Sequence, residues 1–249
     1  MTTQTEWFQA NLLSLNVKKT SYIVFSNRRK LDVNIILANT QINRVDDTRF
    51  LGVIISSKLN WNKHIDVVVN KICKTVGIIA KVRYLLPLSA TRTLYMALVE
   101  PYINYCNIVW AQSEPTTKLD RILKIQKKLC RLITFSHYRE HAQPLFQQLS
   151  VINIYQTYKY QLAIFMFKQT HHLLPIEGTF SFFANSSIHS HFTRQHGNIH
   201  IQQCRTHRRQ MTVMIQGPKL WNSLPPLIRG CPSFSCFKKL FKEHLLAQL

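Results

Sequence analysis

Acidic residues are scarce in this chain of 249 residues. Asp and Glu together number 11 against 32 Lys and Arg, which gives a formal net charge of +21. Residues 178–242 contain no carboxylate at all, although they hold nine Lys or Arg and five His. So large an excess of positive charge favours polyanions as partners. The composition therefore predicts a protein that binds nucleic acid.

Glycine is also rare, with 6 residues in the whole chain. This is about a third of average usage, and it leaves little for the glycine-rich phosphate loops of dinucleotide-binding and P-loop enzymes. The sequence has no G-x-S-x-G, H-E-x-x-H or C-x-x-C motif, so it lacks the patterns that usually indicate a hydrolase or a metalloprotease. Apolar residues make up 46% of the chain, which suffices for a buried core and excludes a disordered basic tail.

The sequence shows no feature of secretion or membrane insertion. The six cysteines lie far apart, and the N-terminus lacks the charged and apolar regions of a signal peptide. We therefore expect an intracellular protein with reduced thiols, in the nucleus or the cytoplasm. The longest apolar run, residues 94–110, is interrupted by Glu100 and Pro101, so we expect no membrane span.

Residues 1–58 are expected to form a small β-region after a short first helix. Three runs, 22–25, 33–42 and 49–56, are rich in aromatic and β-branched residues and are separated by polar connections of hairpin length. We therefore expect one small antiparallel sheet over residues 20–56.

Residues 59–175 are expected to be helical. From Trp61 the apolar period changes from two to about 3.6, and Lys71 and Lys74 lie opposite the apolar face of the first helix, which Pro87 ends. Three further helices are expected, one beginning with Ser89 as its N-cap, one over 117–135 and one over 152–173. The fold class is therefore α+β and mostly α.

Residues 176–249 are expected to form a basic extension that ends in an amphipathic helix. Residues 186–215 lack a helical apolar stripe, and residues 217–230 are rich in proline and glycine. Because local carboxylates are missing, we expect residues 178–242 to be a mobile arm that becomes ordered on nucleic acid.

Two groups of residues are weak candidates for metal sites. Asp46 and Asp47 resemble the start of a two-metal site, but neighbours on a strand point to opposite faces, and a solvated turn explains the pair as well. A histidine-rich segment offers zinc ligands in a spacing that matches no common finger, and a polar loop explains it equally well. Its members are His189, His191, His196, His200, Cys204 and His207.

The helix expected over 117–135 carries the strongest candidate for a nucleic-acid contact. Four cations recur at i, i+3, i+7 and i+10 and so form one stripe along the helix. A charged helical face is often only solvated, but Asp120 is the one acid nearby, so ion pairs within the helix do not account for this stripe. We call these residues the basic stripe: Arg121, Lys124, Lys128 and Arg131.

Several phrases of the sequence, taken in order, resemble the C-terminal part of reverse transcriptases from non-LTR (LINE-like, jockey-like) retrotransposons. EWFQANLLSLNVKKTSYIVF resembles the end of the palm, and RFLGVIISSKLNWNKHI resembles the signature that follows it. The phrases LYMALVEPYINYCNIVW, HAQPLFQQLSVINI and GPKLWNSLPPLI then follow in the usual order, as does the helix with Ile125 and Gln126. The resemblance covers nearly the whole chain.

The resemblance implies roles for particular residues. Lys18 or Lys19 matches a palm lysine that assists nucleotide addition. The helices after Trp61 match a thumb that grips an RNA–DNA duplex by its backbone, and we expect Lys71 and Lys74 to contact nucleic acid there. The primer-grip hairpin of the family is matched by Phe50, Leu51 and Gly52.

The sequence departs from the family at the catalytic centre. The family's catalytic carboxylates lie upstream, in a part that includes an aromatic-Ala-Asp-Asp turn, and Met1 stands just beyond that turn. The Asp expected after the L-G-x-x-I segment is replaced by Ser56. The full-length enzyme would use Mg²⁺, but phosphoryl transfer needs carboxylates to hold the ions, so we expect no cofactor in this chain.

The sequence therefore predicts a fragment of a retrotransposon RNA-directed DNA polymerase that binds a primer or an RNA–DNA duplex without catalysis. The alternative is an unrelated basic, helical structural protein that binds RNA or DNA, for which the charge and the basic stripe suffice. An upstream in-frame relic of the aromatic-Ala-Asp-Asp turn would favour the first interpretation, and unrelated introns would favour the second.

Overall fold

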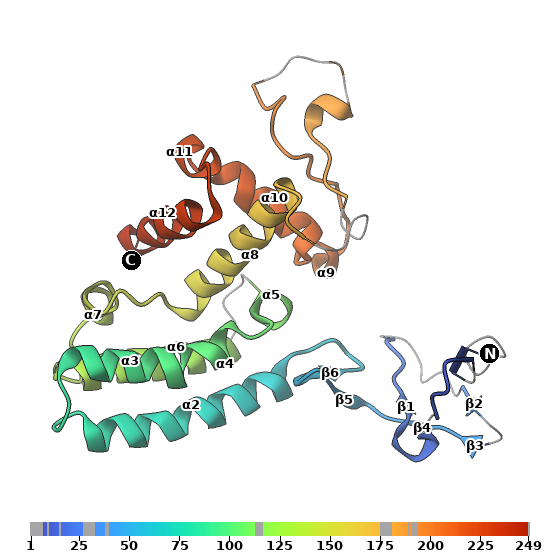
Figure 1. The fold of residues 1–249 in the computed structure, drawn as a ribbon, viewed down its shortest axis with the longest axis horizontal. Helices are drawn as coiled ribbons and strands as arrows, with labels where there is room; N and C mark the ends of the chain where they lie inside the picture. Colours follow the sequence, from blue (N-terminus) through green and yellow to red (C-terminus); the bar gives the residue numbers. More distant parts are fainter. Residues whose placement is uncertain are drawn as a thin grey trace. The chain divides into compact units, whose positions relative to one another are not determined.

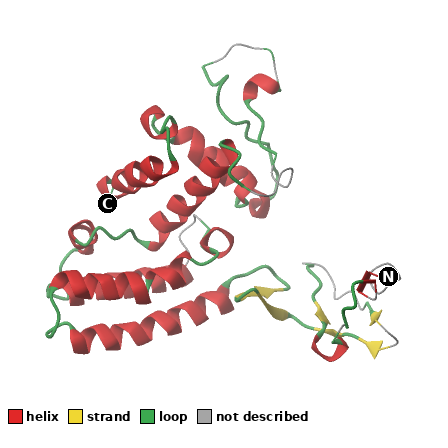
Figure 2. Ribbon diagram, viewed as in Figure 1, coloured by secondary structure: helices red, strands yellow, loops and turns green. Residues whose placement is uncertain are grey.

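Helices dominate the computed structural model of this protein, and its strands are short (Figures 1 and 2). This confirms the predicted fold class. The chain divides into two compact units, Met1–Asp66 and Val67–Leu249. The predicted regions 59–175 and 176–249 thus fall almost entirely within one unit. The structure describes residues 7–8, 10–14, 16–26, 33–37, 40–112, 117–174, 181–188, 190 and 194–248.

The N-terminal unit contains three separate two-stranded sheets among its described residues, so the prediction of one antiparallel sheet over residues 20–56 is wrong. One of the three pairs is parallel. Aromatic and β-branched residues show that a segment fits a pleated surface, but they do not select its partner strand. The pairs are β1 (Ser21–Tyr22) with β4 (Asn43–Arg44), β2 (Ile36–Leu37) with β3 (Thr40–Gln41), and β5 (Asp47–Phe50) with β6 (Val53–Ser56).

The run 49–56, predicted as one strand, is instead mostly a tight hairpin. Phe50 pairs with Val53, and Leu51 and Gly52 form the two-residue turn between β5 and β6 with φ angles of 45° and 84°. Two positive φ angles define the type I′ turn, whose twist matches that of the strands it joins. Gly52 was the local signal for this turn, since glycine adopts positive φ without strain.

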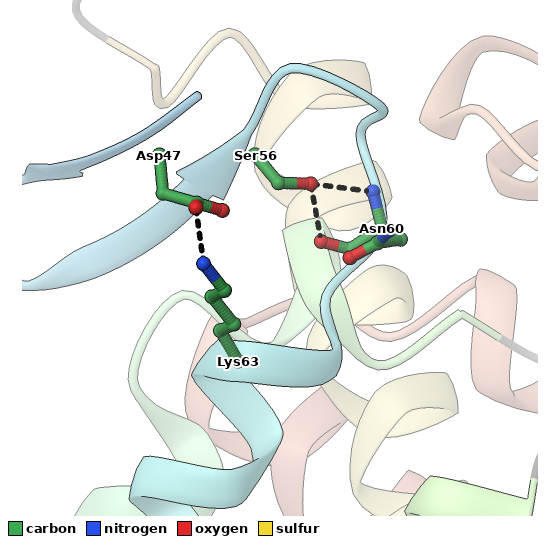
Figure 3. Close-up of polar contacts among 4 residues, drawn as sticks. All are labelled: Asp47, Ser56, Asn60 and Lys63. Carbon is green, nitrogen blue, oxygen red and sulfur yellow. Dashed lines mark hydrogen bonds and ion pairs between the residues drawn. The ribbon is translucent and has the colours of Figure 1, made fainter. Parts of the chain in front are cut away.

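Polar contacts join this hairpin to the start of α2 (Asn62–Val82), as Figure 3 shows. The Ser56 hydroxyl accepts a hydrogen bond from the Asn60 backbone N–H at 3.0 Å and donates one to the Asn60 carbonyl at 2.9 Å. The Lys63 ammonium forms an ion pair with the Asp47 carboxylate. Ser56, at which the chain departs from the reverse-transcriptase pattern, therefore closes the loop that leads into the helix.

The longer helices lie where the apolar period predicts them, and α2, α6, α8 and α12 confirm the prediction. Ser89 is not an N-cap, because α3 already begins at Leu88 with Pro87 before it in extended conformation. None of the described helices combines the length and apolar character that crossing a membrane requires. After α2 the helices are α3 (Leu88–Leu98), α4 (Glu100–Asn104), α5 (Asn107–Trp110), α6 (Thr117–Thr134), α7 (Ala142–Gln148), α8 (Ile154–Thr170), α9 (His207–Gln210), α10 (Val213–Ser223), α11 (Pro226–Arg229) and α12 (Phe234–Ala247).

Helices α10 and α12 of the basic extension pack against α8. The prediction of a mobile arm over residues 178–242 is therefore wrong for the part of it that these two helices contain. Phe167 of α8 lies 4.5 Å from the Phe237 ring and 6.4 Å from the Trp221 ring, measured between centroids. Apolar residues occur all round α8, and a helix of this kind is stabilised only when it is covered on most sides. The buried residues of this core are Ile152, Ala163, Met166, Phe167, Trp221, Leu224, Ile228, Cys231, Phe237, Phe241 and Leu245.

Alanine substitutions at two helical glycines should change the free energy of unfolding in opposite directions. Gly77 lies exposed in α2 with open space around an added Cβ, whereas a Cβ on Gly217 of α10 would lie 2.5 Å from the Met166 Sδ atom. Gly77→Ala should raise the free energy of unfolding by about 0.5–1 kcal/mol, because alanine loses less backbone entropy in a helix. Gly217→Ala should lower it by about 1–2 kcal/mol, because the methyl must displace the buried Met166 side chain and the helix propensity of alanine offsets only part of that cost. Urea titration measures both changes, and a Gly217→Ala variant as stable as the parent would contradict the α8–α10 packing.

Candidate nucleic-acid interface

Helix α6 separates an apolar side from a cationic side. Its buried residues recur at helical spacing and pack into the C-terminal unit, which fixes the rotation of the helix about its axis. The basic stripe lies on the other side, so the fold that buries the first set presents the second. The buried residues are Leu119, Ile122, Gln126, Leu129, Cys130 and Ile133.

Gln126 is the polar residue in that buried set, and both its amide nitrogen and its amide oxygen form hydrogen bonds. Its Nε2 donates to the Tyr95 hydroxyl at 2.9 Å and to the Ile152 carbonyl at 3.4 Å, and its Oε1 accepts from the Ile154 N–H at 2.8 Å. Burial raises the pKa of Tyr95 well above its usual value, so the phenol stays protonated. One side chain of α6 thereby contacts α3 and the start of α8.

The four residues of the basic stripe are not equivalent. Lys124 and Lys128 are exposed, whereas Arg121 is half-buried and engaged with other groups. Arg131 donates to the Glu140 carbonyl from Nε at 2.9 Å and from Nη2 at 2.7 Å, so it fastens the loop that follows α6. Lys124 and Lys128 are therefore the members best placed to contact a phosphate.

Carboxylates do not neutralise this surface in the part of the chain that the structure describes. Asp120, the acid nearest to the stripe, accepts a hydrogen bond from the Tyr155 hydroxyl at 2.7 Å. The Asp47 carboxylate forms an ion pair with Lys63 of α2, away from the stripe. The exposed ammonium groups of Lys124 and Lys128 can therefore contact an external anion.

The other predicted contact residues form two groups. Lys71 and Lys74 are exposed on α2, and the Lys71 Nζ atom lies 4.9 Å from the centroid of the Tyr102 ring. Both lysines belong to the C-terminal unit, as the stripe does. The remaining residues belong to the N-terminal unit, where they are exposed around η1 (Val17–Lys19) and at the tip of the β5–β6 hairpin: Lys18, Lys19, Phe50, Leu51 and Gly52.

The candidate metal ligands do not assemble into a metal centre within the described residues. Asp46 and Asp47 line one pocket, in which the Lys63 ammonium pairs with the Asp47 carboxylate. His200 Nδ1 lies 3.1 Å from the Asn185 amide oxygen, and His189 and His191 lie outside the described residues. Over the described parts of the chain, no three His, Cys, Asp or Glu side chains are placed to hold one ion.

Sequence reasoning missed a cationic cleft beside the same core. This cleft of about 430 Å³ lies among residues of α4, α8 and α12, and Lys168, Lys238 and Lys242 line it together with Glu100. Burial raises the pKa of Glu100, although the nearby Lys242 and Arg92 oppose the shift. Three lysines from two helices add to the positive surface of the C-terminal unit.

A cluster of one arginine and two aromatic rings was also missed. The Arg83 guanidinium carbon lies 4.5 Å from the centroid of the Tyr84 ring and 4.8 Å from that of Phe135. We call Arg83, Tyr84 and Phe135 the Arg83 cluster. Its signal in the sequence is weak, because it consists only of aromatic residues just after the ends of two helices.

Comparison with known proteins gives no relative, since no family model, no curated protein and no solved structure matches the chain. The function must therefore be argued from the surface just described and from the order of the sequence phrases.

Proposed function

We propose that this chain binds nucleic acid, with the exposed lysines of the basic stripe contacting the phosphate backbone. The observation that carries the proposal is the exposure of Lys124 and Lys128 on a helix whose opposite side is locked into the core. Lysines spaced along one helical face follow a backbone of phosphates, and this kind of contact does not depend on base sequence.

Within this proposal, the chain is a C-terminal fragment of a retrotransposon reverse transcriptase. The support is the order of the phrases from the palm end to GPKLWNSLPPLI, together with a β5–β6 hairpin whose turn is formed by Leu51 and Gly52, as the primer-grip match requires. The preferred ligand is then an RNA–DNA duplex or a primer end. The alternative, an unrelated basic structural protein, predicts the same phosphate contacts without a preference for the hybrid.

Catalysis is not part of the proposed function. Two-metal phosphoryl transfer needs carboxylates that converge on the ions, and Asp47 is instead paired with Lys63. The chain would act by holding a strand or a duplex.

The lysines of the stripe should control the salt dependence of binding. Changing Lys124 and Lys128 together to Gln should make the plot of log affinity against log salt for duplex DNA shallower by about 1.8, because each phosphate contact releases about 0.9 counterion. Fluorescence anisotropy at several salt concentrations measures this slope. The matched control changes Lys159 and Lys239, exposed on α8 and α12, to Gln with the same loss of charge. Equal slopes for the two variants would show that the stripe is only a solvated face.

The purified chain should not extend a primer. With template, nucleotides and either Mg²⁺ or Mn²⁺, we expect no incorporation, because Asp46 and a Lys63-paired Asp47 do not supply the carboxylates that two ions need. A gel-based extension assay tests this. Incorporation that disappears in the Asp46→Asn, Asp47→Asn double variant would overturn the assignment as a non-catalytic fragment.

A further inference from the structure

The aromatic rings of the Arg83 cluster are largely exposed to solvent. Tyr84 is 69% exposed and Phe135 is 55% exposed, and Tyr138, three residues after Phe135, is 67% exposed. Single exposed apolar residues are ordinary, but exposed aromatic rings that contact each other, as those of Tyr84 and Phe135 do, mark an interaction site. The cluster is therefore a candidate for binding.

The rings of the cluster are held in place rather than left loose. Arg83 donates from Nη1 to the Leu132 carbonyl at 3.1 Å, which ties the end of α2 to the end of α6. The Tyr84 and Phe135 rings meet edge to face with centroids 5.4 Å apart. A ring that is already ordered loses less entropy when a partner stacks on it.

Phe135 occupies a backbone position that suits glycine. It follows α6 with a φ of 56°, and the next residue, Ser136, donates its N–H to the Arg131 carbonyl at 3.0 Å. This bond pattern is a Schellman-type helix end, in which the residue of positive φ is usually glycine. A bulky side chain is strained there, and Phe135 remains 55% exposed despite its contacts with Arg83 and Tyr84, so burial alone does not explain the phenylalanine.

The charge around the cluster selects an anionic partner. Lys128 and Arg131 lie in the last two turns of α6, and the Arg139 guanidinium carbon lies 5.2 Å from the centroid of the Tyr138 ring. Glu140 is the one carboxylate in residues 135–140, and the neighbouring Arg139 offsets its charge. Aromatic faces beside several cations match the surfaces that stack the bases of a single strand while they neutralise its phosphates.

We propose that the Arg83 cluster stacks unpaired bases of a single-stranded nucleic acid whose phosphates contact the adjoining end of the basic stripe. This inference rests on the proposed function and adds to it a second contact, which only unpaired nucleotides can use. A duplex hides its base faces within its own stack, so it contacts the lysines of α6 without using the cluster.

The test compares a single strand with a duplex. The probes are a fluorescein-labelled oligothymidylate of roughly 12 nucleotides and a duplex of the same length, a size within the usual footprint of such surfaces. Phe135→Gly and Tyr84→Ala should each weaken binding of the single strand by about ten-fold. Affinity for the duplex and the salt slope should not change, because no phosphate contact is removed. Phe183→Ala, which removes another exposed ring (56% exposed), is the matched control and should bind as the parent does.

The melting temperature of the Phe135→Gly variant distinguishes a role of Phe135 in binding from a role in folding. Phe135→Gly should keep or raise the melting temperature, since glycine relieves the positive φ. If Phe135→Gly and Tyr84→Ala bind the single strand as tightly as the parent, the stacking proposal is wrong, while phosphate binding by the stripe stands. If the parent binds neither probe, the proposed function itself fails.

Discussion

The buried amide of Gln126 is the interaction on which the C-terminal unit depends most. It bonds to Tyr95, Ile152 and Ile154, and it is 1% exposed. Removing it would leave a buried hydroxyl and a backbone N–H without this partner, which costs more than the bonds themselves contribute. Together with the buried apolar residues of α6, these bonds set the rotation of the helix about its axis and so which side faces outward. The cationic surface is thus a consequence of a neutral contact in the core.

Amides perform the same task elsewhere in this unit. Gln156 of α8 donates to the Leu245 carbonyl at 2.7 Å, and Gln147 of α7 donates to the Leu246 carbonyl at 3.0 Å, so both join the end of α12 to the preceding helices. A chain with few carboxylates cannot use many ion pairs to connect its helices. Neutral amides make these connections without consuming cations, which leaves the lysines and arginines available to a polyanion.

The sequence predicted the helices well and the partners of its segments poorly. The apolar period located α6 and α8 because helical periodicity is a local property. Strand pairing is not local, so the parallel β1–β4 pair could not be foreseen, and the packing of residues 213–247 on α8 depends on a complementary surface distant in the sequence. The spacing of the cations in the sequence indicated the basic stripe. The hydrogen bonds from Arg131 to the Glu140 carbonyl depend on the backbone conformation after α6, which no local pattern indicates. The Arg83 cluster joins residues about 50 positions apart, and no spacing rule indicates such a contact.

The most direct test of the account is to map which lysines a bound nucleic acid covers. Brief acylation of the chain with an amine-reactive reagent, with and without an RNA–DNA duplex, followed by mass spectrometry, reports the protection of each lysine. We predict that Lys124 and Lys128 become protected while Lys159 and Lys239, which are also exposed, on α8 and α12, remain reactive. Uniform protection of all four lysines, or protection of the second pair alone, would contradict it.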